Sequence, residues 1–159
     1  MSNISNPGLS TLKVRLGYGV ETTAGTKPAA FTWLQRVNSI GGVSLSTEQI
    51  DVSAIEDDVT KYTAGRQDTG GEWTVTFNVN DEVVAQLNTM ISAYQALTDG
   101  KRMWFEVYSP YMTNAFFVVA APPLHLPIPE TGQNEAWTME LTFTIVEYQD
   151  ASTAIEPTA

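Results

Sequence analysis

Apolar and polar residues alternate in several short stretches of the chain, and each alternation predicts a β-strand with one face on a core. Turn-forming residues such as Gly, Pro and Asn separate most of these stretches. We therefore expect six to eight strands. The stretches are residues 12–20, 31–37, 72–79, 102–109, 114–121 and 136–148.

One stretch has the helical period instead. Between Asp81 and Thr98 the apolar residues form a single stripe, which predicts a helix over residues 81–98 that packs by one face. Asn80 or Asp81 can cap its first turn, and Gly100 follows its end.

Strands and helices do not alternate along the chain, so we expect mainly antiparallel sheets. The predicted fold class is mainly β: an antiparallel β-sandwich or open barrel with one flanking helix. The 159 residues form one domain, with an N-terminal arm at 1–10 and a C-terminal tail at 149–159.

Residues 46–71 lie between two strand patterns but carry no sustained period of their own. Isolated apolar residues are spread there among carboxylates. A structureless connection longer than about 12–15 residues is usually functional or disordered, and the apolar residues recur too regularly for disorder. We interpret the segment as a long loop that contacts another chain.

The composition narrows the possible functions. The net charge is -10, and residues 48–82 hold nine acids against Lys61 and Arg66. Such an acidic surface repels nucleic-acid phosphates. There is no cysteine, which excludes disulfides and thiolate chemistry. The N-terminus does not resemble a signal peptide, and no apolar run approaches the ~18–20 residues of a membrane helix. We expect a soluble chain without membrane contact.

No arrangement of residues points to catalysis. The single histidine, His125, lies in a proline-rich stretch, and no G-x-S-x-G turn is present. The acids around Asp57 and Asp58 lack the spacing of a calcium loop. The glycines at 65 and 70–71 precede no phosphate-binding Lys. We expect no enzyme activity, no metal and no cofactor.

The order of several short motifs resembles the major tail proteins (tail tube proteins) of long-tailed, siphovirus-type bacteriophages. The run Glu48-Gln49-Ile50-Asp51-Val52-Ser53 is followed by Tyr62, Gly65, Asp68 and Gly70, then by the alternating strand at 72–79 and the helix. The resemblance covers about residues 41–100. The proline-rich connection at 122–129 has no counterpart in it.

This resemblance implies a β-sandwich subunit of hexameric rings that stack into a hollow tube. The partners it implies are further copies of the chain, a tape-measure protein, and the tail terminator and baseplate proteins. DNA passes through the lumen without specific binding. The implied location is the virion, after synthesis in the cytoplasm of the host bacterium.

Two sets of residues become candidates for assembly. We expect the long loop to dock on a neighbouring subunit or ring through Gln49, Ile50, Asp51, Val52, Ile55, Asp57, Asp58, Tyr62, Gly65 and Asp68. Its carboxylates would meet scarce cations such as Lys13, Arg15 or Arg36, or face the DNA path. The polar faces of two alternating strands are candidates for the lumen wall: Glu72, Thr74, Thr76, Asn78, Thr138, Glu140, Thr142 and Thr144. One of these faces could instead be the outer surface.

Two alternatives remain. The first is another phage tail or secretion-tube component of the same fold. The second is a carbohydrate-binding or adhesin-like β-sandwich, for which exposed tryptophans would be needed. Trp33, Trp73 and Trp137 are in phase with apolar strand faces, which predicts core positions, whereas Trp104 is out of phase and is a candidate for a helix or partner contact.

Overall fold

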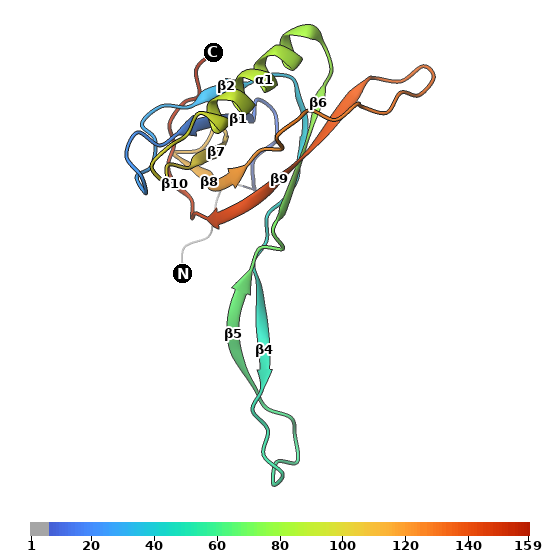
Figure 1. Cartoon of the computed structure of the whole chain (residues 1–159). Helices are drawn as coiled ribbons and strands as arrows, with labels where there is room; N and C mark the ends of the chain where they lie inside the picture. The colour runs from blue at the N-terminus through green and yellow to red at the C-terminus, as the bar shows by residue number, and fades with distance from the viewer. Residues whose placement is uncertain (1–6) are drawn as a thin grey trace.

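The computed structural model describes residues 7–159, and in this range it contains ten strands and one helix (Figure 1). It confirms the predicted mainly β, antiparallel, sandwich-like fold with one flanking helix. The arm expected at 1–10 lies largely outside the described residues. The elements are β1 (Arg15–Val20), β2 (Thr32–Leu34), β3 (Val37–Ile40), β4 (Ser46–Asp51), β5 (Tyr62–Asp68), β6 (Glu72–Asn78), α1 (Asp81–Gln95), β7 (Met103–Tyr108), β8 (Asn114–Ala121), β9 (Thr138–Tyr148) and β10 (Ser152–Thr153).

The main sheet has the strand order β2-β1-β7-β8-β9-β6-β3, and its neighbouring strands are antiparallel. Only Gln35 and Arg36 separate β2 from β3, although these strands lie at opposite ends of that order. The sheet therefore folds back on itself until its edges meet. Because no pairing joins β2 to β3 in the described part of the chain, the barrel stays open. The single strand expected at 31–37 is wrong, because Arg36 has a φ of 59° and breaks it.

The main core lies between the folded halves of the sheet and the helix. Strands β6 and β9 pair in the register Trp73 to Phe143 and Val75 to Leu141, so their apolar residues face inward together. The Phe143 ring lies 5.4 Å from Trp73 and 4.9 Å from Phe105. The predicted alternation in these two strands is confirmed.

Helix α1 begins as predicted and closes one end of the core. The Asn80 side chain accepts a hydrogen bond of 2.8 Å from the backbone N–H of Val83. The helix buries Val83, Leu87, Met90 and Ile91 and ends at Gln95, three residues before the predicted end. Gln86 accepts from the backbone N–H of Gln35 at 2.9 Å, which ties the helix to the link between β2 and β3.

A second apolar cluster lies on the outer face of β1, β7 and β8 and includes Phe31, Trp104 and Phe117. Trp104, expected to contact a helix or partner, is buried in it, and Trp137, expected in the core, is 49% exposed. Residues 149–159, expected as a polar tail, lie over this cluster, and β10 pairs with β8. Strand β1 is buried on both faces rather than on one, because Pro157 and Phe31 cover Gly17, and Phe31 and Pro28 cover Gly19.

The segment expected as a long loop at 46–71 is mostly a β-hairpin. Strands β4 and β5 pair with each other, with a register shift between Thr47 and Gln49, and form a separate two-stranded sheet. Its hydrogen bonds are local and no face of it is buried in this chain, so its sequence has no reason to alternate.

Candidate assembly surfaces

The hairpin β4–β5 continues the β3–β6 pair as one long ribbon that leaves the body and projects into solvent (Figure 1). All residues of β4 and β5 are exposed except Gly65, which is half-buried. An isolated two-stranded hairpin is marginally stable in water. The hairpin therefore has a hydrogen-bonded pair of strands but no core of its own.

Polar contacts shape the tip of the hairpin. The Asp57 carboxylate accepts from the backbone N–H of Ala54 at 2.8 Å and forms an ion pair with Lys61, also at 2.8 Å. The hydrogen bond from Lys61, with the one from Ala54, lowers the pKa of the Asp57 carboxyl. Asp51 accepts from the backbone N–H of Ser53 at 2.9 Å. Asp51 and Asp57, two of the carboxylates expected to meet partner cations, therefore form hydrogen bonds within the tip.

Apolar side chains are displayed along the hairpin. Ile50, Val52 and Tyr62 are each about half exposed or more, and Ile55 at the tip is fully exposed. A Cβ at Gly65 would lie 3.0 Å from Cδ1 of Ile50, so glycine at this position leaves room for Ile50 to lie across the neighbouring strand.

The structure brings all ten predicted docking residues onto this hairpin. Gln49, Ile50 and Asp51 lie on β4, and Tyr62, Gly65 and Asp68 lie on β5. Val52, Ile55, Asp57 and Asp58 lie in the connection between these strands. Arg15 is one of the cations expected to meet the carboxylates of the hairpin. Within this chain it pairs with Glu156 at 3.3 Å and lies over the Trp33 ring. Docking of the hairpin on another chain stays a prediction.

The predicted lumen residues form a single polar ladder. Strands β6 and β9 place them directly opposite one another in four cross-strand pairs, on the face that points away from the core. Asn38 of β3 extends this face, because its side-chain N–H donates to Asn78 at 3.1 Å. The pairs are Glu72 with Thr144, Thr74 with Thr142, Thr76 with Glu140, and Asn78 with Thr138.

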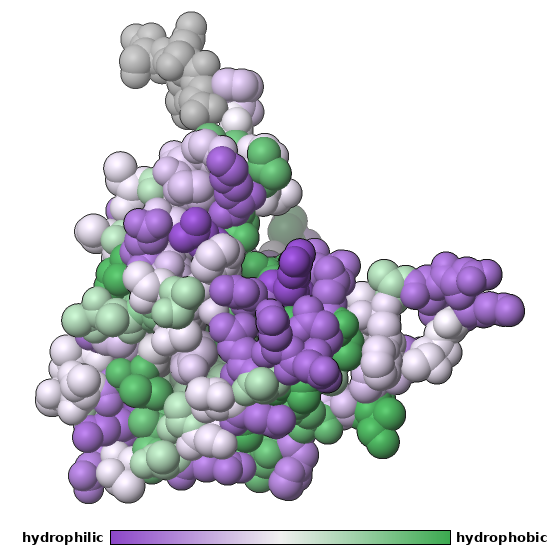
Figure 2. Space-filling view, turned by 90° about the horizontal axis from the view of Figure 1, so that it is seen from above, coloured by the Kyte–Doolittle hydropathy of each residue, from purple (hydrophilic) through white to green (hydrophobic). Residues whose placement is uncertain are grey.

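The connection between β8 and β9 forms a second projection, which the sequence analysis did not predict. Residues 122–137 connect β8 to β9: Pro122 is buried and Leu126 packs on the main core, and the residues beyond them project as an arm whose end is largely hydrophilic in Figure 2. Ile128 on this arm is 97% exposed. A groove of about 330 Å³ separates the arm from the polar ladder and is lined by Thr76, Glu140 and Glu130 among others. The four prolines at 122–129 were the sequence signal for this arm, because proline is incompatible with an internal strand of a sheet.

The open seam of the barrel leaves a larger cavity of about 680 Å³. It lies between the free edge of β3 and strands β7 and β8, and Ile40, Val43, Val107 and Phe116 are among its lining residues. An unpaired strand edge beside apolar side chains can accept a strand from another chain.

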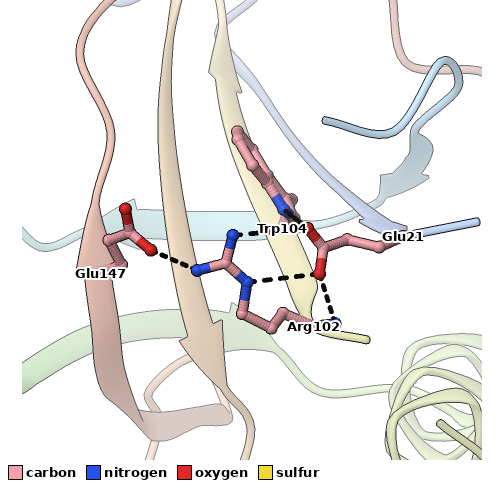
Figure 3. A network of polar contacts seen from close by, with 4 residues as sticks. All are labelled: Glu21, Arg102, Trp104 and Glu147. Carbon is pink, nitrogen blue, oxygen red and sulfur yellow. Dashed lines mark hydrogen bonds and ion pairs between the residues drawn. The ribbon is translucent and has the colours of Figure 1, made fainter. Parts of the chain in front are cut away.

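A partly buried ion-pair network, which the sequence reasoning missed, joins three strands (Figure 3). Glu21 follows β1, and its carboxylate accepts from the backbone N–H of Arg102 at 2.7 Å and from Nε1 of Trp104 at 3.1 Å. Arg102 also forms ion pairs with Glu21 and, across β8, with Glu147 of β9. Burial raises the pKa of Glu21, but these hydrogen bonds outweigh it and leave the pKa below its usual value. The network connects β1, β7 and β9.

Among residues 7–159, no group of three or more His, Asp or Glu side chains is placed to hold a metal ion. In the same range, no helix has the length and apolar character needed to span a membrane.

No protein-family model and no curated protein sequence matches this chain. Solved structures show the class of fold: a mainly β subunit fold found in tail and injection assemblies. A chain in the cryo-EM structure of the anti-feeding prophage cap, the AFP tube terminating cap, aligns with a TM-score of 0.62 at 12% identity, covering 97% of each chain.

Two further structures have the same fold. A chain in the sheath/tube terminator of an extracellular contractile injection system (PVC, extended state) aligns with a TM-score of 0.59 at 14% identity, covering 96% of this chain and 100% of that one. A chain in the tail of an empty GTA particle, refined with C6 symmetry, aligns with a TM-score of 0.56 at 13% identity, covering 93% and 100%. At these identities the likeness shows a shared fold.

Proposed function

We propose that this chain is a non-enzymatic structural subunit of a phage-type tail tube, in which hexameric rings stack into a hollow tube that conducts DNA. The observation that carries the proposal is the projecting hairpin β4–β5, whose strands pair with each other yet which exposes Ile50, Val52, Ile55 and Tyr62. Such a hairpin gains stability by packing on another surface.

The shared fold supports a second copy as the partner, because the structures that resemble this chain come from tube, cap and tail assemblies. A contact between two different patches of identical chains closes into rings or extends into filaments. The free edge of β3 and the cavity beside it offer one patch, and the hairpin offers another.

The polar ladder of β6 and β9 is the proposed lumen wall. Its hydroxyl, amide and carboxylate groups carry no positive charge. Phosphate binding requires cations, so such a wall lets DNA pass without holding it. In this proposal a tape-measure protein occupies the lumen during assembly, terminator and baseplate proteins bind the ends, and the chain is located in the virion.

A tube terminator or cap is the second candidate. It is favoured because two of the similar structures are of a cap and of a sheath/tube terminator. Negative-stain electron microscopy of the purified chain at rising concentration separates the two. Long tubes of stacked rings support a tube subunit, and single rings that do not stack support a terminator. A monomer at all concentrations contradicts both.

The role of the hairpin is tested by the double change Ile50→Asp and Ile55→Asp. We expect a folded monomer that no longer assembles, because two charges would enter the proposed contact. Ile128→Asp is the control, since Ile128 is an isoleucine outside the hairpin that is about as exposed as Ile55. Normal tubes from the double variant, or equal loss of assembly in the control, would contradict a specific role of the hairpin.

A further inference from the structure

The end of the chain crosses the outer face of the sheet from β8 to β2. We call residues 152–158 the C-terminal strap. At its start Ser152 and Thr153 pair with β8, and Ala154 donates its backbone N–H to Thr113 at 3.0 Å. At its end Thr158 accepts from Trp33 at 2.8 Å through backbone groups. The strap is therefore fastened at both ends.

The strap covers apolar residues that would otherwise face water. Ala154 and Ile155 pack on the cluster that contains Phe31, Trp104 and Phe117. The fit is close at Gly17 of β1, where a Cβ would lie 3.0 Å from Cγ of Pro157 and 3.2 Å from Phe31. Glycine at this position therefore allows the strap to approach the sheet.

A carboxyl group lies under the middle of the strap. Glu106 of β7 is 0% exposed and lies opposite Gly17 on β1 and Phe117 on β8. Its Oε1 accepts from the backbone N–H of Ile155 at 3.1 Å, while its Oε2 has no partner. An ionised carboxylate with one unpaired oxygen is costly to bury. Burial accordingly raises the pKa of Glu106 to about 7.

Lys27 is the cation that interacts with Glu106, and it is already engaged with the strap. Its Nζ donates to Oγ of Ser152 at 2.9 Å and to the carbonyl of Thr153 at 3.2 Å, and it lies 3.6 Å from the centre of the Phe117 ring. The other charged or titratable groups on this face are the Arg15–Glu156 pair at its rim, Tyr108 as the next residue on β7, and the network of Glu21, Arg102 and Glu147 on the far side of Trp104.

We propose that the C-terminal strap is a pH-sensitive latch, closed over the sheet while Glu106 is protonated and loosened when Glu106 ionises and competes with the strap for Lys27. Opening would expose the cluster of Phe31, Trp104 and Phe117 as a new apolar surface. The inference rests on contacts within one chain and does not depend on the proposed function.

The direction of the pH effect follows from the proton balance. The closed form holds its proton to about pH 7, whereas a solvated glutamate releases it near 4.5. The closed form is therefore most stable below pH 4.5, and this stability is lost as the pH rises to about 7. Above that pH both forms are ionised, and the effect levels off.

Amide hydrogen exchange of Ile155 and Thr158 in the full chain tests the latch. After correction for intrinsic exchange, protection in the wild type should fall roughly 10- to 100-fold between pH 5 and 7.5 and change little above. Glu106→Gln keeps the size of the side chain but cannot ionise, so its protection should be independent of pH. Glu156→Gln, on the exposed strap carboxylate, is the matched control and should behave like the wild type.

Gly17→Ala gives an independent check, because its methyl group would meet Pro157 and loosen the strap at every pH. Equal wild-type protection at pH 5 and 7.5 would overturn the proposal. So would a Glu106→Gln variant that keeps the wild-type loss of protection, or a Glu156→Gln variant that abolishes it.

Discussion

The long ribbon of this chain has two halves that differ in what covers them. In the β3–β6 half, Trp73, Val75 and Phe77 of β6 are buried in the main core. In the β4–β5 half, no residue is buried, although the backbone pairing is equally regular apart from one register shift in each half. Both halves therefore have paired, hydrogen-bonded strands, but only the β3–β6 half has buried apolar side chains.

This difference separates what folds the chain from what remains available for contact. Burial of apolar surface is the dominant favourable term in folding, and only the first half contributes to it. The exposed isoleucines and tyrosine of the second half lie outside the core of this chain, and the proposed function assigns them to a contact with a partner. A hairpin that stabilised the body would contradict this distinction.

Truncation in the core should have the largest effect. Phe143→Ala removes a fully buried ring that contacts Trp73 and Phe105. We expect a loss of about 3–5 kcal/mol in the free energy of unfolding, measured by urea denaturation of the unassembled chain. Tyr62→Ala, the matched aromatic change in the hairpin, should alter it by no more than about 0.5 kcal/mol. A large loss from Tyr62→Ala would show that the hairpin belongs to the folding unit.

Changes in the ion pairs should have an intermediate effect, which depends on how far each carboxylate is buried. Glu21 and Glu147 bind the same Arg102, but the Glu21 side chain is fully buried and that of Glu147 is 52% exposed. Glu21→Gln should cost roughly 2–3 kcal/mol of unfolding free energy, because it weakens several bonds to a buried carboxylate. Glu147→Gln should cost under about 1 kcal/mol. Equal losses from the two changes in urea denaturation would contradict the assigned difference in burial.

The same difference explains which parts of the fold the sequence predicts. Strands β6 and β9 were predictable because one face of each is buried in this chain, which imposes alternation. The β4–β5 hairpin was not predictable, because neither of its faces is buried in this chain. Its strands are held by local hydrogen bonds, which impose no alternation. The ten docking candidates do lie together on it, because they are close in sequence. The polar ladder was predicted residue by residue from alternation, although only the register of β6 and β9 shows that its members pair.

Other features could not be predicted because they depend on contacts between distant segments. The break between β2 and β3 follows from the positive φ of Arg36, a residue type that gives no sign of it. The C-terminal strap has a two-residue strand, too short for any period to appear. Glu106 did leave a signal, as an acid within the otherwise apolar strand of residues 103–108, but its burial depends on the strap that covers it.

The smallest effect is expected at the hairpin tip, where two neighbouring aspartates have different surroundings. Asp57 accepts from the backbone of Ala54 and pairs with Lys61, whereas Asp58 is exposed beside it. Asp57→Ala should increase amide exchange at Ala54 several-fold without a measurable shift in the urea midpoint, because the tip has no contact with the core. Asp58→Ala, the matched control, should change neither quantity.

The order of the tip should also depend on pH. Because its hydrogen bonds lower the pKa of Asp57 below the usual 3.8, the tip should stay ordered above that pH and loosen as the pH falls through the lowered value. Amide exchange at Ala54, followed by NMR from pH 5 downward and corrected for intrinsic rates, measures this. Because Glu21 in the body also has a lowered pKa, coupling to the body is judged at constant pH with Asp57→Ala. If that change lowered the urea midpoint, the two halves of the ribbon would form one cooperative unit, and the exposed residues of the hairpin would need no partner to explain them.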